Sequence, residues 1–196
     1  VKEAEFLAAN NAKEIVIIAQ DTTDYGIDIY GERKLALLLE KLSLINGIEW
    51  IRLMYAYPTK FPDDVIEIIK NNPKICKYVD IPLQHISDDV LRSMRRGVTS
   101  KRTKELLFRL RDKIPGIVLR TTFIVGYPNE TEKDFEELCE FIKEVRFERV
   151  GVFTFSSRGT DKFACAAKYS TASINGKFSF CIIKLNKSPC APQPKQ

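Results

Sequence analysis

The chain has 196 residues, with 31 Lys and Arg, 26 Asp and Glu and a single His, which gives a formal net charge of +5. Because domains run to about 100–200 residues, this length predicts one domain, or one domain with a tail. No apolar run approaches the roughly 18–20 residues that cross a bilayer, and the N-terminal segment VKEAEFLAANNAKE lacks the apolar stretch of a signal peptide. These features argue against a transmembrane protein and predict a cytoplasmic one.

Charge and cysteine are unevenly distributed, and the change falls near Ser156. Residues 157–196 hold seven Lys and Arg but a single acid, Asp161, so subtraction from the totals leaves 24 basic and 25 acidic residues in 1–156. The body therefore has no electrostatic bias towards nucleic acid. We predict a folded domain over 1–156 and an unassigned basic tail over 157–196, disordered or non-homologous, in which 177–185 has the pattern of one strand.

Within 1–156, short apolar runs alternate with amphipathic segments. The predicted strands are 15–19, 48–57, 78–83, 117–125 and 149–155. The predicted helices are 1–11, 35–44, 62–71, 87–94, 100–113 and 132–145. The first strand, IVIIA, has no polar alternation, which is typical of a strand buried on both faces. Thr131 with Asp134 three residues later resembles a capping box at the start of the last helix.

This order of elements predicts an α/β fold with a mostly parallel sheet and right-handed helical crossovers. Both a doubly wound sheet and a (β/α) barrel fit it. The chain opens on a helix with no strand before it. In a barrel, that helix would follow a first strand that is absent here, so we expect a piece of a larger protein.

Polar or aromatic residues follow each predicted strand directly. Parallel α/β proteins bind ligands at the carboxyl ends of their strands, so these loops predict one polar pocket of the kind that holds a nucleotide-like cofactor. The loops are 20–25, 55–59, 84–85, 126–130 and 154–156. No G-x-G-x-x-G or G-K-[ST] run is present, which argues against a dinucleotide fold or a P-loop.

Two arginines and the single histidine have alternative interpretations. Arg52 and Arg120 lie within predicted strands, where a charge needs a partner; for Arg120 the alternatives are a ligand site and a structural ion pair. A single histidine excludes a histidine-rich metal site, and His85 is either a cofactor contact or a hydrogen-bonded loop residue.

The cysteines and one basic segment also have two interpretations each. The chain has five cysteines, an odd number, which indicates free thiols in a chain without a secretory signal. Cys76 and Cys139 fit a packing role better than a chemical one. The segment 92–97 (RSMRRG) is either a solvated basic turn or a loop that contacts an acidic group at the pocket mouth.

Four segments, taken in order, resemble one family. QDTTDYG, IRLMYAYPTKF, DIPLQHISDDVLRSMRRG and LRTTFIVGYPNETEKDF are similar to the radical SAM methylthiotransferases over about residues 1–156. Asp21-Thr22-Thr23 and His85 favour the branch known as RimO, because the tRNA-modifying, MiaB-like branch has an Asn-Val-Asn type loop and a Ser at these places.

The resemblance implies a partial (β/α)6 barrel lacking its first strand. It also implies a transferase in which a [4Fe-4S] cluster cleaves S-adenosylmethionine (SAM) and a methylthio group is added to the β-carbon of an aspartate in a small-subunit ribosomal protein. The partner would be that protein, with no membrane and no nucleic acid indicated. The alternatives are a tRNA-modifying methylthiotransferase and a catalytically silent α/β binding module.

The family pattern assigns cofactor contacts to individual positions. It implies that Gln20, Thr22 and Thr23 meet the methionine end of SAM, with Arg120 at its carboxylate. Gln84 would lie by the ribose with His85 beside it, and the adenine would contact Ile124, Gly126 and Phe153. The family's C-x-x-x-C-x-x-C run is not present in the sequence, so no metal ligands are expected here and this fragment alone is predicted to be inactive.

Overall fold

The molecule is organised around one curved parallel sheet. A computed structural model describes residues 1–156, 168–174 and 178–184. Its five-stranded sheet has the order β1-β2-β3-β4-β5, and every neighbouring pair is parallel. The strands are β1 (Glu14–Ile17), β2 (Trp50–Leu53), β3 (Ile75–Asp80), β4 (Val118–Val125) and β5 (Arg149–Thr154).

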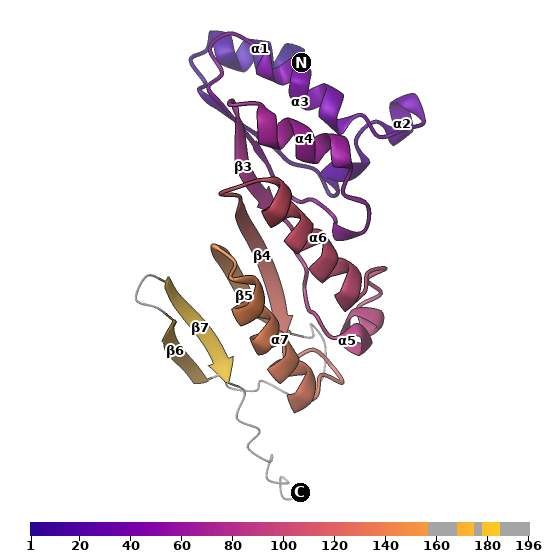
Figure 1. Ribbon diagram of the computed structural model, residues 1–196, viewed down its shortest axis with the longest axis vertical. Helices are drawn as coiled ribbons and strands as arrows, with labels where there is room; N and C mark the ends of the chain where they lie inside the picture. Colours follow the sequence, from indigo (N-terminus) through magenta and orange to yellow (C-terminus); the bar gives the residue numbers. More distant parts are fainter. Residues whose placement is uncertain (157–167, 175–177, 185–196) are drawn as a thin grey trace, which may run out of the picture.

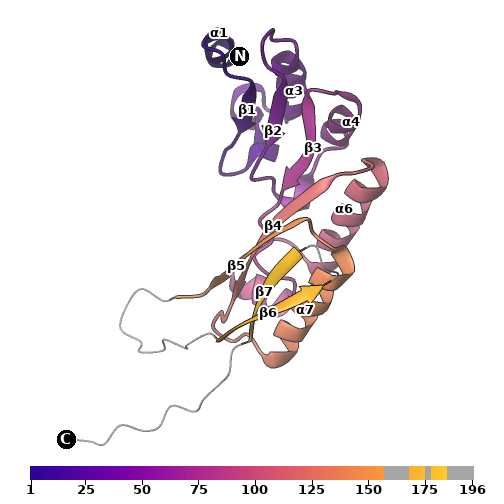
Figure 2. The same cartoon turned by 90° about the vertical axis from the view of Figure 1, so that its left-hand side faces the viewer.

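The strand order distinguishes the two predicted architectures. Each right-handed crossover moves the sheet one strand further in the same direction, which places the crossover helices on one face, as in a barrel. A doubly wound sheet would instead reverse direction part of the way along. The α/β prediction is therefore confirmed, and the sheet is an open part of a (β/α) barrel with its long helices along one face (Figures 1 and 2).

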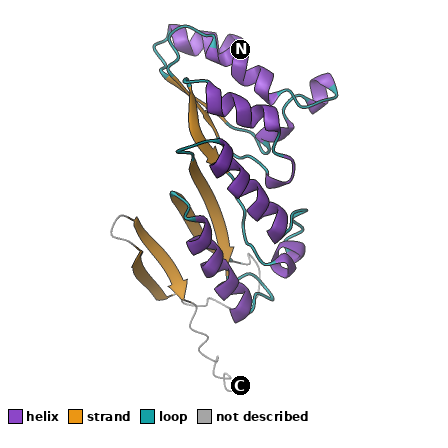
Figure 3. Ribbon diagram, in the orientation of Figure 1, coloured by secondary structure: helices purple, strands orange, loops and turns teal. Residues whose placement is uncertain are grey.

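The helices follow the predicted segments closely. The long ones are α1 (Lys2–Ala9), α3 (Leu35–Ser43), α4 (Asp63–Asn71), α6 (Ser100–Lys113) and α7 (Glu132–Val145), shown in purple in Figure 3. The short ones are α2 (Ile27–Tyr30), α5 (Asp88–Ser93) and the 3-10 turns η1 (Thr22–Asp24) and η2 (Pro58–Lys60). The predicted 48–57 strand is too long, because after Leu53 the backbone turns away and Tyr55 has a left-handed φ of 57°.

The core lies between the sheet and the helices. Burial alternates along β4, where Leu119, Phe123 and Val125 are buried against the helices. The Phe123 ring makes edge-to-face contacts with Phe141 and Phe147, with centroids 6.3 and 6.0 Å apart. Every second strand residue therefore faces away from the helices, onto a surface that we call the concave face.

The concave face corrects one sequence prediction. The first strand was expected to be buried on both faces, but Val16 is 46% exposed and Ile18 just beyond the strand is 61% exposed. Ile15 and Ile17 pack against the core, whereas the other side of β1 stays exposed, because the helices cover only one side of the sheet. Cys76, Tyr78 and Asp80 of β3 alternate with the core residues Ile75 and Val79.

The basic tail contains two paired strands. β6 (Lys168–Ile174) and β7 (Phe178–Lys184) pair in antiparallel register, so the one strand predicted over 177–185 is present and has a partner. The prediction of disorder or non-homology for the rest of 157–196 lies outside the described residues. Among the residues that the structure describes, no helix combines the length and the apolar character needed to cross a membrane.

Candidate functional site

The loops that follow β1 and β2 are joined by hydrogen bonds at the carboxyl edge of the sheet. The Thr22 hydroxyl lies 3.1 Å from the carbonyl oxygens of both Met54 and Tyr55, and the Thr22 amide donates to Tyr55 at 3.1 Å. The Thr23 amide and hydroxyl both donate to Asp21 Oδ1. Thr22 and Thr23 are each 1% exposed, so their polar atoms shape the loop from within, whereas Gln20 is exposed.

Three consecutive strands are each followed, within four residues, by a residue with left-handed backbone. The φ angles are 57° at Tyr55 after β2, 72° at Gln84 after β3 and 74° at Gly126 after β4. The left-handed region costs a non-glycine residue about 1–2 kcal/mol, and it persists where neighbours enforce it. At Gln84 the neighbour is β4, because the Gln84 amide donates to Thr122 at 2.9 Å and its carbonyl accepts from Ile124 at 2.8 Å.

Gly26 allows the chain to leave the first loop. Its φ is 100°, and a Cβ atom placed there would lie 2.9 Å from the Glu32 carbonyl oxygen. We expect Gly26→Ala to lower the free energy of unfolding by about 1–2 kcal/mol, measured by urea denaturation. Gly97→Ala is the matched control, because φ is not left-handed there and no atom lies within 4 Å. Equal losses in the two variants would contradict this account.

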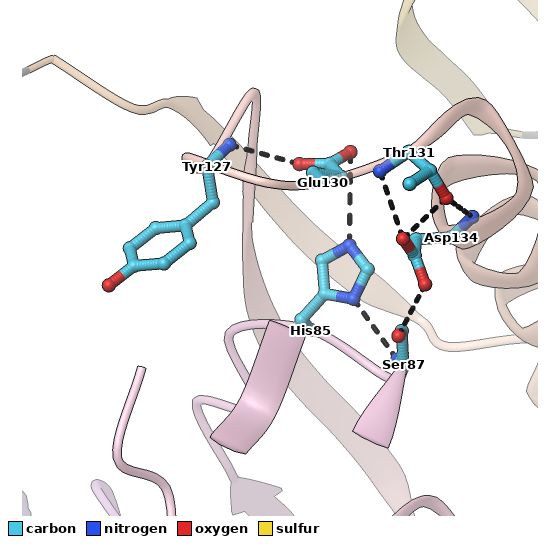
Figure 4. A network of polar contacts seen from close by, with 6 residues as sticks. All are labelled: His85, Ser87, Tyr127, Glu130, Thr131 and Asp134. Atoms are coloured by element: carbon cyan, nitrogen blue, oxygen red, sulfur yellow. Dashed lines mark hydrogen bonds and ion pairs between the residues drawn. The ribbon is translucent and has the colours of Figure 1, made fainter. Parts of the chain in front are cut away.

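A buried polar network joins the loops that follow β3 and β4 (Figure 4). His85 is 1% exposed, and its Nδ1 accepts a hydrogen bond from the Ser87 amide at 3.1 Å. Its Nε2 lies 3.9 Å from Glu130 Oε1, while Glu130 Oε2 accepts from the Tyr127 amide at 3.0 Å. His85 is therefore a hydrogen-bonded loop residue through its Nδ1, whereas its buried Nε2 has no hydrogen-bond partner among the described residues.

The same network continues into the start of α7. The Ser87 hydroxyl donates to Asp134 Oδ1 at 2.5 Å, and the amide and hydroxyl of Thr131 donate to Asp134 Oδ2 at 2.9 and 2.6 Å. The predicted capping box is therefore confirmed. Burial acts to raise the pKa of Asp134, but the hydrogen bonds from Ser87 and Thr131 outweigh it and lower the pKa.

This lowered pKa has a consequence for stability. A carboxyl group whose pKa is lower in the folded state stabilises the protein above its unfolded pKa of about 3.9, and that stabilisation is lost as pH falls through the folded value. We expect Asp134→Asn to cost about 1 kcal/mol at pH 7 and progressively less below pH 4, measured by urea denaturation at several pH values. Glu136→Gln, on the exposed side of α7, is the control, and a pH-independent deficit in Asp134→Asn would contradict the assignment.

The strand arginines face the concave face and have acidic partners. Arg120 Nη1 lies 3.1 Å from Asp80 Oδ2; Asp80 is fully buried, whereas the Arg120 side chain is 38% exposed. Burial raises the pKa of Asp80, and Arg120 offsets part of that rise. Arg52 Nε lies 2.6 Å from Glu14 Oε1, with the Arg52 guanidinium 4.7 Å from the centre of the Tyr78 ring.

In the basic segment 92–97, Arg92 fits the solvated turn, and Arg96 fits neither interpretation. Arg92 forms an exposed ion pair with Asp89. Arg96 instead donates to the Pro82 carbonyl oxygen at 2.8 Å, and its guanidinium lies 4.8 Å from the centre of the Tyr57 ring. It thus ties the segment after β3 to the loop after β2 and contacts no acidic side chain among the described residues.

The apolar part of the predicted site lies where β4 and β5 end. Ile124 pairs with Phe153, which is 63% exposed, and Gly126 follows two residues after Ile124. Gln84 pairs with Phe123 on the other side of β4, so these predicted positions are neighbours. Cys76 and Cys139 are half-buried on β3 and α7, and burial raises the pKa of both thiols, as expected for packing residues.

Sequence reasoning missed Asp80 and the partner of Arg52. The available signal for Asp80 was an acid at the end of the segment YVD, one strand away from Arg120. Its use required the register that makes Asp80 the ladder partner of Arg120. For Arg52, a partner or a ligand anion was expected, and Glu14 on the neighbouring strand is that partner.

The sheet order and the one-sided helices together define an open (β/α) barrel whose strand-end loops lie at one edge. The sequence pattern of the radical SAM superfamily matches residues 1–142, and the chain belongs to that superfamily. Comparisons with solved structures agree with this fold. A radical S-adenosylmethionine methyltransferase, TsrM from Kitasatospora setae, solved with cobalamin and a [4Fe-4S] cluster, matches with a TM-score of 0.61 at 19% identity, over 78% of this chain and 29% of that one. Coproporphyrinogen III oxidase from Escherichia coli matches with a TM-score of 0.52 at 18% identity. That match covers 62% of this chain and 28% of the oxidase.

Curated relatives narrow the resemblance further. The chain is 59% identical over 156 residues to ribosomal protein uS12 methylthiotransferase RimO of Flavobacterium johnsoniae, which covers 80% of this chain and 36% of that protein. It is 60% identical to RimO of Christiangramia forsetii, over 80% of this chain and 35% of that protein. It is 53% identical to RimO of Desulforamulus reducens, over 79% of this chain and 35% of that protein. The predicted resemblance to the RimO branch is confirmed, and the chain spans about a third of the length of these relatives.

Proposed function

We propose that this chain is the part of a RimO-type radical SAM methylthiotransferase that holds SAM against the carboxyl edge of the sheet. The observation that carries the proposal is the arrangement of this edge: loops from β1 to β4 are fixed to one another by hydrogen bonds that a buried polar network supplements. The identity of 51–60% to RimO proteins, over about 80% of the chain, supports it.

The predicted residues other than Arg120, which is paired with Asp80, each have a place in this proposal. The exposed ring of Phe153, with its half-buried ladder partner Ile124 and the nearby Gly126, offers an apolar surface for the adenine ring. Gln84, held in a left-handed turn by β4, reaches the ribose. Gln20 meets the methionine end, while Thr22 and Thr23 act indirectly by shaping its loop, and His85 acts indirectly by holding the turn at Gln84.

The iron–sulfur cluster does not fit the described residues. When bound, such a cluster supplies the electron that cleaves SAM to a 5′-deoxyadenosyl radical. It needs three converging thiolates, but no group of three Cys, His, Asp or Glu side chains with metal-binding geometry occurs in the part of the chain that the structure describes. Cys76 and Cys139 lie on separate elements, β3 and α7, and do not supply the ligand set of a cluster. The role proposed for the residues at the carboxyl edge of the sheet is to bind and orient SAM and to keep water from it.

We further propose a ribosomal protein substrate in the cytoplasm, with an aspartate as the modified residue. All the RimO relatives described above are named for ribosomal protein uS12. The near-neutral charge of 1–156 gives no support to the alternative of a tRNA substrate. Binding of purified uS12 and of tRNA to the full-length protein, measured side by side, separates the two, and preference for tRNA would overturn the ribosomal assignment.

Calorimetry with the 196-residue chain tests cofactor binding. We expect saturable binding of SAM, no comparable binding of GTP, and weaker binding of SAM to Gln84→Ala. Arg102→Gln is the control, because Arg102 is exposed on α6 on the opposite side of the sheet. Absence of SAM binding, or equal affinity for SAM and GTP, would favour a catalytically silent binding module instead.

A further inference from the structure

The charge of residues 1–156 is near zero in total but is unevenly placed. Residues 92–102 hold five Lys and Arg and no acid, which leaves 19 basic and 25 acidic residues in the rest of 1–156. A segment with a net charge of +5 therefore lies on a body whose remaining charge is −6. Charges separated in this way orient a charged partner, because one face attracts it and the remainder repels it.

Three exposed side chains of this segment, Arg92, Arg95 and Lys101, form what we call the basic rim. Arg95 makes no ion pair with any residue in the part of the chain that the structure describes. Arg92 pairs with Asp89 at 2.9 Å, and Lys101 pairs with Glu105 at 3.9 Å. All four of these side chains are at least 61% exposed, and ion pairs as exposed as these contribute little to stability.

The basic side chains further along α6 differ from the basic rim, because their acidic partners lie on other parts of the chain. Lys104 Nζ lies 2.8 Å from Glu144 Oε2 on α7, and Arg111 Nη1 lies 3.0 Å from Glu148 Oε1 just before β5. Those pairs join α6 to its neighbours. The rim residues pair at most within their own helix, so packing does not account for their charges.

Two features of the basic rim lower stability. Lys101 lies in the first turn of α6, which holds no acidic residue, and a positive charge there opposes the helix dipole. Arg95 has a left-handed φ of 55°, which is unfavourable for a residue with a side chain. Because these charges are kept at a cost and stabilise no contact between elements, binding accounts for them better than folding does.

The basic rim lies beside the carboxyl edge of the sheet, next to the proposed cofactor site. The Tyr127 hydroxyl, in the loop after β4, donates to the Ser93 carbonyl oxygen at 3.4 Å and so ties the end of α5 to this edge. Figure 1 shows α5 and the start of α6 near the carboxyl end of β4. Arg96 is not part of the rim, because its guanidinium lies over the Tyr57 ring. A partner bound at the rim would therefore lie next to the site.

We propose that the basic rim binds the phosphate backbone of RNA and directs the site onto a ribosomal protein in its RNA surroundings. Arginine and lysine bind phosphates without reading the base sequence, and the planar guanidinium does so through two parallel hydrogen bonds. RNA is the anionic partner that surrounds a ribosomal protein in the ribosome, so the ribosomal origin of the RNA rests on the proposed function. The RNA is an anchor beside the site and not the molecule that is modified.

Fluorescence anisotropy with a fluorescein-labelled RNA hairpin of about 20 base pairs measures this contact in the 196-residue chain. We expect the double variant Arg95→Asn, Lys101→Gln to bind the hairpin about tenfold more weakly at about 0.1 M salt. It should also reduce the slope of log affinity against log salt concentration by about 2, because each phosphate contact contributes about 0.9 to that slope. Asparagine is chosen at position 95 because it tolerates left-handed backbone.

Two further double variants separate this role from a structural one. Lys41→Gln, Lys70→Gln removes two exposed charges from the last turns of α3 and α4, and it should leave the affinity and the slope nearly unchanged. Arg95→Lys, Lys101→Arg keeps both charges of the rim and should retain binding. Equal losses in the two neutralising variants, or an equally large loss in the charge-preserving variant, would overturn the inference.

A labelled polyglutamate peptide tests the other class of anionic partner. We expect the chain to bind the RNA hairpin and not polyglutamate. Polyglutamate binding as tight as RNA binding, and equally dependent on the rim, would assign an acidic protein instead and overturn the RNA contact. The proposed function is tested separately by SAM binding, which Arg95→Asn, Lys101→Gln should retain. If the unmodified chain binds the hairpin through the rim but does not bind SAM, the proposed function fails and the RNA contact stands.

Discussion

Replacing Phe123 with alanine is expected to lower the free energy of unfolding by about 3–5 kcal/mol, the largest effect we predict. Phe123 is fully buried at the centre of the contact between β4 and α7, and its ring meets both Phe141 and Phe147. The surrounding helices and strands cannot close fully over the space that the ring leaves. Because Phe123 is also the bridge partner of Gln84, the loss reaches the turn at the proposed cofactor edge.

Urea denaturation of the full chain measures this effect, with Phe108→Ala as the matched control. Phe108 lies on α6 and is 42% exposed, so its removal should cost less than about 1 kcal/mol. Equal losses in the two variants would show that β4 and α7 do not pack as described.

Arg120→Gln is expected to have the second largest effect, about 2 kcal/mol at pH 7. Removal of one partner of a fully buried ion pair costs about 3–5 kcal/mol, and the partial exposure of Arg120 reduces that figure. The cost arises at Asp80, whose carboxylate then lies buried without a counter-ion. A second substitution, Asp80→Asn, should therefore restore most of the lost stability.

The pH dependence provides a second measurement of the same effect. Burial already raises the pKa of Asp80, and loss of Arg120 would raise it further, so the folded state binds a proton more tightly than the unfolded state. The deficit of Arg120→Gln should be greatest well above the folded pKa and should shrink as pH falls through it. A deficit that stays constant from pH 7 to pH 4, or that Asp80→Asn deepens, would contradict the ion-pair account.

Most of the fold could be predicted from local patterns. Apolar periodicity predicted segments that overlap all five strands and the five long helices, because each buries an apolar face against its neighbours. The strand predicted over 78–83 lies three residues too late, since β3 spans Ile75–Asp80. The end of β2 was placed too late because the run MYAY continues to be apolar and aromatic after the backbone has turned at Tyr55. The exposed side of β1 was missed because periodicity does not tell how many faces of a sheet the helices cover.

The candidate site was predicted at the level of loops but not of atoms. The loops after β1, β3 and β4 were correctly placed at one edge, because parallel strands direct their carboxyl ends the same way. Thr22 and His85 direct their polar atoms towards neighbouring loops rather than towards solvent. This orientation depends on contacts between residues that are 32 and 45 positions apart in the sequence. Asp80, Arg120 and Arg149 occupy paired positions on β3, β4 and β5. This pairing depends on the register between neighbouring strands, which composition and spacing do not reveal.

The most direct test of the central claim is an NMR titration of the 196-residue chain with SAM, followed at the backbone amides. The account predicts that the largest shifts fall in the loops at the carboxyl edge of the sheet: residues 20–23, 55–57, 84–85, 126–130 and 154–156. Shifts confined to the outer surfaces of α6 and α7, or to the opposite edge of the sheet, would contradict it.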